Sequence, residues 1–146
     1  MRKLTVLLFI FFLLVGCENK EEKTMVCQGT NGDIQVTNTI KYIGKTVTSV
    51  SYQDTMIVDD SLVSYISNYL DGYKETLKGL EGVVFSYEIE GSNVITTTTI
   101  DYSVANIDEL VNAGLMDSIQ SEKEKVIDYE LTINYMKTLG LTCSEQ

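Results

Sequence analysis

The sequence predicts an α+β domain, in which an antiparallel sheet of about five strands has helices packed on one face. Two patterns support this fold class. Segments in which apolar and polar residues alternate occur in groups joined by short turns, which is typical of strands with one buried and one wet face. Each group is followed by a segment with apolar residues three or four positions apart, which predicts amphipathic helices able to cover the sheet. The expected order of elements is β-β-β-α-β-β-α-α.

Three strands are expected first, at Met25–Gly29, Asp33–Ile43 and Thr46–Val58. Asn31-Gly32 is a strong hairpin signal between the first two, and Gly44-Lys45 supplies the next turn. The apolar residues of the second and third strands lie on one face of each strand. They are Ile34, Val36, Ile40 and Tyr42 in the second strand, and Val50, Tyr52, Met56 and Val58 in the third.

The first helix is expected from Ser61 to Lys78. Asp59, Asp60 and Ser61 are good N-cap residues, and acidic side chains are favourable at the positive end of a helix. A calcium-binding or acid/base role for Asp59 and Asp60 is the alternative to capping. The residues expected to face the sheet are Leu62, Ile66, Tyr69, Tyr73, Leu77 and Leu80.

A second hairpin is expected after this helix, with strands at Val83–Glu90 and Val94–Tyr102 and a turn at Gly91-Ser92-Asn93. The second strand contains four consecutive threonines, Thr96–Thr99. Because β-branched side chains pack well on a pleated surface, the run is interpreted as a solvent-facing strand surface. A ladder of ligand-binding threonines is the alternative.

Two helices complete the predicted fold. Asn106 and Glu109 have the spacing of a capping box and predict a helix over Ile107–Ala113. Ser121 and Glu124 repeat that spacing and predict a last helix that ends at Gly140. The apolar stripe of this last helix is Val126, Tyr129, Ile133, Met136 and Leu139.

Cys27 and Cys143 lie near the two ends of the predicted domain. Thiols tend to be oxidised outside the cytoplasm, so this pair predicts a disulfide that staples the first strand to the end of the last helix. Two buried free thiols are the alternative. A metal site is not expected, because the chain has no histidine and two cysteines do not make a four-ligand zinc site.

The N-terminal segment has the parts of a secretory signal. Arg2 and Lys3 precede an apolar run, Leu4–Val15, that is shorter than the ~20 residues needed to span a bilayer. Leu14-Val15-Gly16-Cys17 resembles the lipobox of bacterial lipoproteins, in which the cysteine receives a diacylglyceryl group. We therefore expect a signal peptide at 1–16, a lipidated tether at 17–24 that begins with Cys17, and one domain at 25–146. An uncleaved anchor or a buried helix is the alternative.

The chain is acidic, and this limits its partners. Removal of residues 1–16 changes the formal charge from −10 to −12, because Arg2 and Lys3 are lost. A protein of this charge without a basic cluster is not expected to bind nucleic acid. It is also repelled by anionic headgroups, so the lipid rather than a basic patch would hold it at the membrane. Solubility alone is a sufficient reason for the acidity.

Two stretches of the chain are similar to the YehR-like family of small bacterial lipoproteins. The first is Asn38–Val47, and the second runs from Tyr87–Asn93 into Val94-Ile95-Thr96, with Ile100-Asp101 and Ile107-Asp108-Glu109-Leu110. The resemblance covers most of Met25–Leu141 by pattern and order of elements. It implies a lipid-anchored α+β domain, and it implies no catalytic or ligand-binding residues.

No pattern of catalytic residues is found in the sequence: it has no glycine-rich phosphate loop, no Gly-x-Ser-x-Gly and no histidine. Glu88 and Glu90 share a strand face and are interpreted as solvated, with cation or basic-peptide binding as the alternative. The candidate ligand-binding residues are four tyrosines on or near apolar strand faces, which could line a groove for a peptide, glycan or lipid fragment. They are Tyr42, Tyr52, Tyr87 and Tyr102. A core whose hydroxyls reach the rim is the alternative.

The sequence therefore predicts a lipoprotein anchored in the cell membrane at its extracytoplasmic face. We expect a monomeric, non-enzymatic binding module for an envelope protein, peptide or glycan, without a cofactor. A small envelope hydrolase that uses aspartate and glutamate carboxylates is the alternative, and it requires two acids in one cleft with different pKa values. A purely structural or stress-related role is a third hypothesis.

Overall fold

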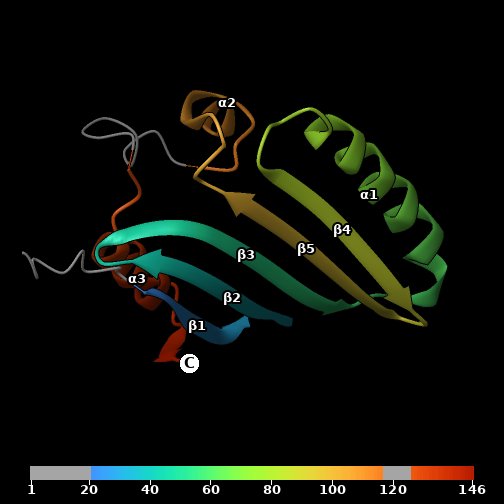
Figure 1. Cartoon of the computed structure of the whole chain (residues 1–146). Coiled ribbons are helices and arrows are strands. Elements are labelled where there is room, and N and C mark those ends of the chain that lie inside the picture. Colours follow the sequence, from blue (N-terminus) through green and yellow to red (C-terminus); the bar gives the residue numbers. More distant parts are fainter. Residues whose placement is uncertain (1–20, 117–125) are drawn as a thin grey trace, which may run out of the picture.

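Six strands form one antiparallel sheet, in the order β4-β5-β3-β2-β1-β6 (Figure 1). The computed structural model describes residues 21–116 and 126–146. The strands are β1 (Glu22–Asn31), β2 (Ile34–Ile43), β3 (Thr46–Ile57), β4 (Val83–Glu90), β5 (Asn93–Asp101) and β6 (Thr142–Glu145). The helices are α1 (Val63–Leu77), α2 (Ile107–Asn112) and α3 (Tyr129–Thr138), with a short 3-10 turn at Asp60–Leu62 before α1. The predicted α+β class is confirmed, with six strands where about five were expected.

Three hairpins join neighbouring strands through two-residue loops that begin with glycine. The loops are Gly32-Asp33, Gly44-Lys45 and Gly91-Ser92. The glycines have φ angles of 61°, 62° and 60°. No other residue type among the described residues has a positive φ, so these loops match the type II′ turn, which needs glycine at its first position. The first loop lies one residue later than the predicted Asn31-Gly32.

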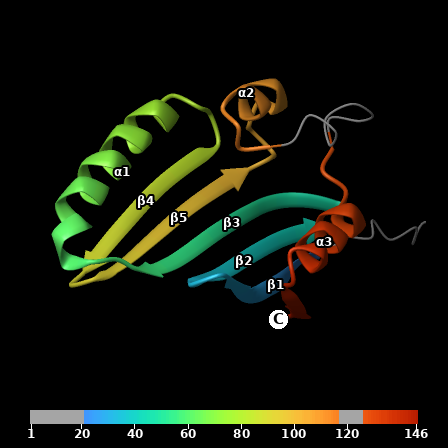
Figure 2. The ribbon, with the colours of Figure 1, turned by 180° about the vertical axis from the view of Figure 1, so that it is seen from behind.

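The inner face of the sheet is covered in two places. Figure 2 shows α3 over the end of the sheet formed by β1, β2 and β3, and α1 alongside β4 and β5. The first buried cluster consists of Cys27, Ile40, Val47, Val50, Ile127, Ile133, Met136 and Leu141. The second consists of Leu70, Leu77, Phe85 and Val94. The middle of the inner face lies between these two clusters, and the candidate functional site is located there.

The last element of the chain differs from the prediction. Thr142–Glu145 form strand β6, which pairs with β1 at the edge of the sheet and was not expected. Strand β1 is also longer than predicted, because Glu22–Thr24, expected in the tether, pair with Lys41, Tyr42 and Ile43. The first and last strands therefore lie side by side, and the residues expected as a tether are in part a strand.

Helix α1 presents a different stripe to the sheet from the predicted one. Leu70 is buried, whereas Leu62 and Tyr69 have exposed fractions of 50% and 63%. The residues of α1 that face the sheet are Ile66, Leu70, Tyr73 and Leu77. They keep the helical spacing, but the face that packs on the sheet is rotated by part of a turn from the predicted one.

Helix α3 begins later than expected, since Asp128 caps it by accepting a hydrogen bond from the backbone N–H of Leu131 at 2.9 Å. The predicted capping box at Ser121 and Glu124 lies outside the described residues. Ile127 precedes the helix and is buried, and its carbonyl accepts a hydrogen bond from the N–H of Val47 at 2.9 Å. The other predicted ends coincide with the structure, as at both ends of Val83–Glu90, or differ from it by one or two residues.

Candidate functional site

An open cleft of about 750 Å³ lies on the inner face of the sheet between the two buried clusters. Its floor is formed by side chains of β2, β3 and β5. One wall is α3, which contributes Thr132, Tyr135 and Met136, with Leu139 just beyond its end. The other wall is α2 and the residues that follow it, Gly114–Met116. The cleft therefore lies between the sheet and two helices.

The floor of the cleft is polar, although it is part of the inner face of the sheet. Asn38 of β2, Tyr52 of β3 and Thr98 of β5 lie opposite one another across three strands. Asp54 is the next inward residue of β3 and lies opposite Val36. Directly opposed and diagonal side chains of neighbouring strands lie within reach of one another. The floor therefore gathers an amide, a carboxyl and two hydroxyl groups.

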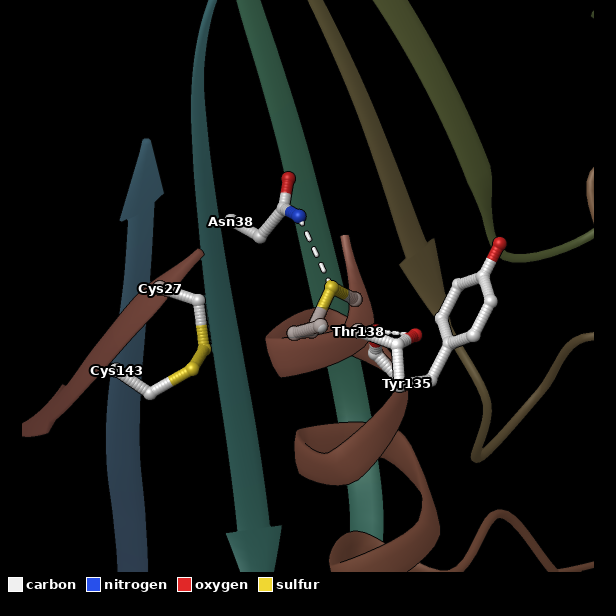
Figure 3. Close-up of a disulfide and its surroundings, with 6 residues drawn as sticks. Cys27, Asn38, Tyr135, Thr138 and Cys143 are labelled. Atoms are coloured by element: carbon white, nitrogen blue, oxygen red, sulfur yellow. Dashed lines mark hydrogen bonds between the residues drawn. A yellow bond between two sulfur atoms is a disulfide. The ribbon is translucent and has the colours of Figure 1, made fainter. Parts of the chain in front are cut away.

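Asn38 is buried with one of its two polar atoms unpaired. Its side chain is only 2% exposed. Its Nδ2 donates a hydrogen bond to Sδ of Met136 at 3.1 Å, as Figure 3 shows. Its Oδ1 is buried and finds no donor within the described residues. A buried polar atom without a partner costs about 1–3 kcal/mol, so this acceptor needs an explanation beyond stability.

Apart from the tyrosines, Asp54 is the only acidic or basic residue that lines the cleft within residues 21–116 and 126–146. Burial raises the pKa of its carboxyl above the ordinary value, because desolvation disfavours the charged form. The ion pairs formed within residues 21–116 and 126–146 do not involve it. An acid in this position, without a cationic neighbour, is available to a positively charged group from outside.

Three tyrosines complete the polar part of the site. Tyr52 and Tyr102 interact through their hydroxyls, and burial raises the pKa of both above the ordinary value. Tyr135 projects from α3 towards the β5 side of the cleft (Figure 3), and 48% of its surface is exposed. These two partly buried phenols stay protonated at neutral pH, so they can donate a hydrogen bond or present a ring face.

The four tyrosines predicted to line a groove are separated by the structure. Tyr52 and Tyr102 line the cleft, as described above. Tyr42 is buried and stacks on Tyr129, with ring centroids 3.9 Å apart and an interplanar angle of 23°. Burial, and a hydrogen bond with Tyr42, raise the pKa of Tyr129 to about 12. Tyr87 lies under α1, where its hydroxyl donates a hydrogen bond to Asp71 at 2.7 Å.

The threonine run is divided between the two faces of the sheet. Thr98 lines the cleft, whereas Thr99 lies on the outer face and shares a hydrogen bond with Ser51 at 3.0 Å. The prediction of a solvent-facing run thus holds for alternate residues only. Sequence reasoning passed over Asn38 and Asp54, although both stand at inward positions between apolar residues and interrupt the alternation of their strands. That interruption was the signal for them.

The acidic candidates outside the cleft have structural roles or lie in solvent. Asp59 caps the turn before α1 by accepting hydrogen bonds from the N–H and hydroxyl of Ser61, which lower the pKa of Asp59. Asp60 accepts a hydrogen bond from the hydroxyl of Ser92. Glu88 and Glu90 are exposed. In the part of the chain that the structure describes, no three ligand-type side chains converge as a metal site.

The predicted disulfide is present between Cys27 and Cys143, which lie opposite each other on β1 and β6 (Figure 3). It joins the first strand to the last strand, where the end of the last helix was expected. Cys27 also lies opposite Asn38 on its other side, so the disulfide and the cleft floor belong to one row across the sheet. The bond holds the chain that follows α3 against the sheet, and so supports one wall of the cleft.

No protein-family model matches the chain, and no curated protein matches it. Two solved structures share its fold. The solution structure of the Escherichia coli YehR protein aligns with a TM-score of 0.72 and 15% identity, over 86% of this chain and 92% of that one. The solution structure of a protein from Streptococcus pneumoniae TIGR4 aligns with a TM-score of 0.56 and 22% identity, over 86% of this chain and 84% of that one. The fold is therefore YehR-like, as the sequence resemblance implied.

None of the described helices is long and apolar enough to cross a membrane. Cys17, the predicted lipidation site, and the predicted signal peptide lie outside the described residues.

Proposed function

We propose that the chain is a lipoprotein that Cys17 anchors at the extracytoplasmic face of the cell membrane, and that its domain binds a ligand in the cleft without reacting with it. The cleft is the observation that carries the binding half of this proposal. Its volume of about 750 Å³ falls in the range of small-molecule sites, which are concave and apolar with a few convergent polar groups.

The anchoring half of the proposal rests on the sequence. A charged start, a short apolar run and Leu14-Val15-Gly16-Cys17 follow one another in the order that lipid attachment requires. A diacylated cysteine carries two long chains, which give stable rather than marginal membrane binding. The acidic chain has no basic patch that could serve instead.

The hydrolase alternative lacks a supporting observation. It requires two carboxyl groups that converge in one cleft, and Asp54 is the only carboxyl that the described part of the chain contributes to the lining. The described residues thus place a single carboxyl group in the cleft, which fits a binding role.

Mass spectrometry of the mature N-terminal peptide is expected to show Cys17 with a diacylglyceryl group and without residues 1–16. The Cys17→Ser variant should lose the lipid, because only a thiol forms the thioether bond. Without its proposed anchor, the variant should leave the membrane fraction. Detection of an unmodified peptide that starts at Met1 would refute the anchor.

The binding half predicts where a ligand acts. In ¹⁵N–¹H correlation spectra of the mature protein, titration with a panel of cationic, neutral and anionic fragments should shift the amide signals of cleft residues such as Tyr52, Thr98 and Tyr135. The signal of Thr97, on the outer face, serves as the internal control because Thr97 belongs to the same strand as Thr98. Fragments that shift only the outer-face signal, or none, would count against the cleft as the binding site.

A further inference from the structure

We propose that the ligand of the cleft carries a cationic nitrogen, an alkylammonium or guanidinium group, attached to an apolar body, and that Asp54 pairs with this cation. The inference rests on the proposed function, because it assumes that the cleft binds a ligand. It adds the chemical class of that ligand, which follows from the charge, the hydrogen-bonding groups and the apolar walls of the site.

The negative charge of the site favours a ligand of positive charge. Among the described residues, Asp54 is the only carboxyl in the lining, and none of them places a lysine or arginine there. A neutral ligand that covered Asp54 would bury an unpaired carboxylate, and an anionic ligand would add repulsion, both at a cost. A cation forms the missing pair. The acidic chain, with a formal charge of −10, also attracts cations towards its surface.

The hydrogen-bond acceptors of the cleft floor favour a ligand that carries hydrogen-bond donors. Oδ1 of Asn38 is a buried acceptor for which the described residues supply no donor, and Asp54 contributes two more acceptor atoms. An ammonium or guanidinium group offers several N–H donors and no acceptor, so it matches this set. Tyr52, Tyr102 and Tyr135 line the same space, and an aromatic ring attracts a cation that lies over its face within about 6 Å.

The walls of the cleft call for an apolar body behind the cation. Ile100, Leu115, Met116, Met136 and Leu139 all line it. Methionine side chains adapt to irregular partners, so the walls fit an aliphatic or aromatic chain without demanding one shape. Two sources supply this chemistry: a free amine with a hydrocarbon chain, and a lysine side chain of a peptide.

The test compares ligands of equal length and different charge. The mature protein is titrated at neutral pH with n-hexylamine, 1-hexanol and hexanoate, and cleft amide shifts give the dissociation constants. A blocked Leu-Lys-Leu peptide is the second arm of the test. If its affinity is at least tenfold higher than that of hexylamine, the source of the cation is a peptide. If its affinity falls short of that tenfold difference, the source is a free amine. Asp54→Asn removes the proposed charge partner. Glu88→Gln removes the same charge from the outer face and is the matched control.

Hexylamine is expected to bind at the cleft more tightly than 1-hexanol, and hexanoate should not bind. Asp54→Asn should weaken the binding of hexylamine about tenfold or more and leave the binding of 1-hexanol unchanged. A hydrogen bond to a charged group changes a dissociation constant by about one to two powers of ten. Glu88→Gln should leave both constants unchanged. Hexylamine should also bind more weakly as the pH falls through the raised pKa of Asp54, because protonation removes the charge.

A second variant separates ligand binding from folding. Asn38→Leu replaces the unpaired acceptor with an apolar group of similar size, so the melting temperature should stay or rise while hexylamine binding weakens. If 1-hexanol or hexanoate shifts the cleft signals as strongly as hexylamine, or if Asp54→Asn leaves hexylamine binding unchanged, the cationic ligand is refuted and cleft binding survives. If no fragment shifts the cleft signals, both the ligand class and the proposed function fail.

Discussion

Reduction of the Cys27–Cys143 disulfide is expected to lower the free energy of unfolding by about 4–5 kcal/mol. The two cysteines are 116 residues apart in sequence, so the bond closes nearly the whole domain into one loop. In the chain-entropy model a cross-link restricts the unfolded chain more as the loop lengthens, and a loop of about 100 residues gives about 4.7 kcal/mol. Strand β6 has only four residues, so little else holds the end of the chain.

Chemical denaturation with and without reductant measures this effect. The Cys27→Ala/Cys143→Ala variant should have the stability of the reduced protein, less a small cost for the volume lost at Cys27, which is fully buried. That variant is also the control, because reductant should not change its denaturation midpoint. Equal stability of the oxidised and reduced wild-type protein would show that the bond does not contribute to folding.

Gly82→Ala is expected to destabilise the domain by about 2–5 kcal/mol. Gly82 has φ +75°, and a Cβ added there would lie 2.6 Å from the carbonyl oxygen of Asp101 and 2.9 Å from Cγ2 of Val104. The left-handed backbone costs a residue with Cβ about 1–2 kcal/mol, and overpacking adds about 1–3 kcal/mol. The neighbouring backbone cannot move away freely, because the N–H of Asp101 donates a hydrogen bond to the carbonyl of Gly82 at 2.8 Å.

Gly114→Ala separates backbone conformation from steric contact. Its φ of +71° is close to that of Gly82, but no atom lies within 4 Å of an added Cβ. Gly114→Ala should therefore lower the free energy of unfolding only by the cost of the left-handed backbone, about 1–2 kcal/mol, in the same denaturation experiment. Equal losses in the two variants would mean that the contact with Asp101 relaxes at no cost.

Local patterns predicted most of the fold because each hairpin and helix carries its own signal. The glycine turns separate strands whose alternation is clear, and the N-cap residues Asp59 and Asn106 mark helix starts that the structure confirms. Strand β6 carries no such signal. Its four residues form a strand because β1 offers an open edge and Cys27 holds Cys143 there, and both causes lie more than one hundred residues away in the sequence.

The candidate site was predicted in part, for a reason that concerns geometry. Alternation assigns a side chain to a face of the sheet, but not to a position on that face. Tyr42 and Tyr87 share the inner face with Tyr52, yet Tyr42 stacks on Tyr129 and Tyr87 packs against the second buried cluster. Asn38 and Asp54 could have been found, because polar residues at inward positions of apolar strands are uncommon and have to be compensated.

The disulfide also determines how the domain would remain on a membrane after damage. Cys27 lies ten residues beyond Cys17, the proposed anchor, and Cys143 lies 116 residues beyond Cys27. All the sequence between the two cysteines is thus a covalent ring attached to the anchor through residues 17–27. A protease that cuts this ring once leaves both pieces joined through sulfur, so shedding of the domain requires a cut between Cys17 and Cys27, reduction of the bond, or two cuts.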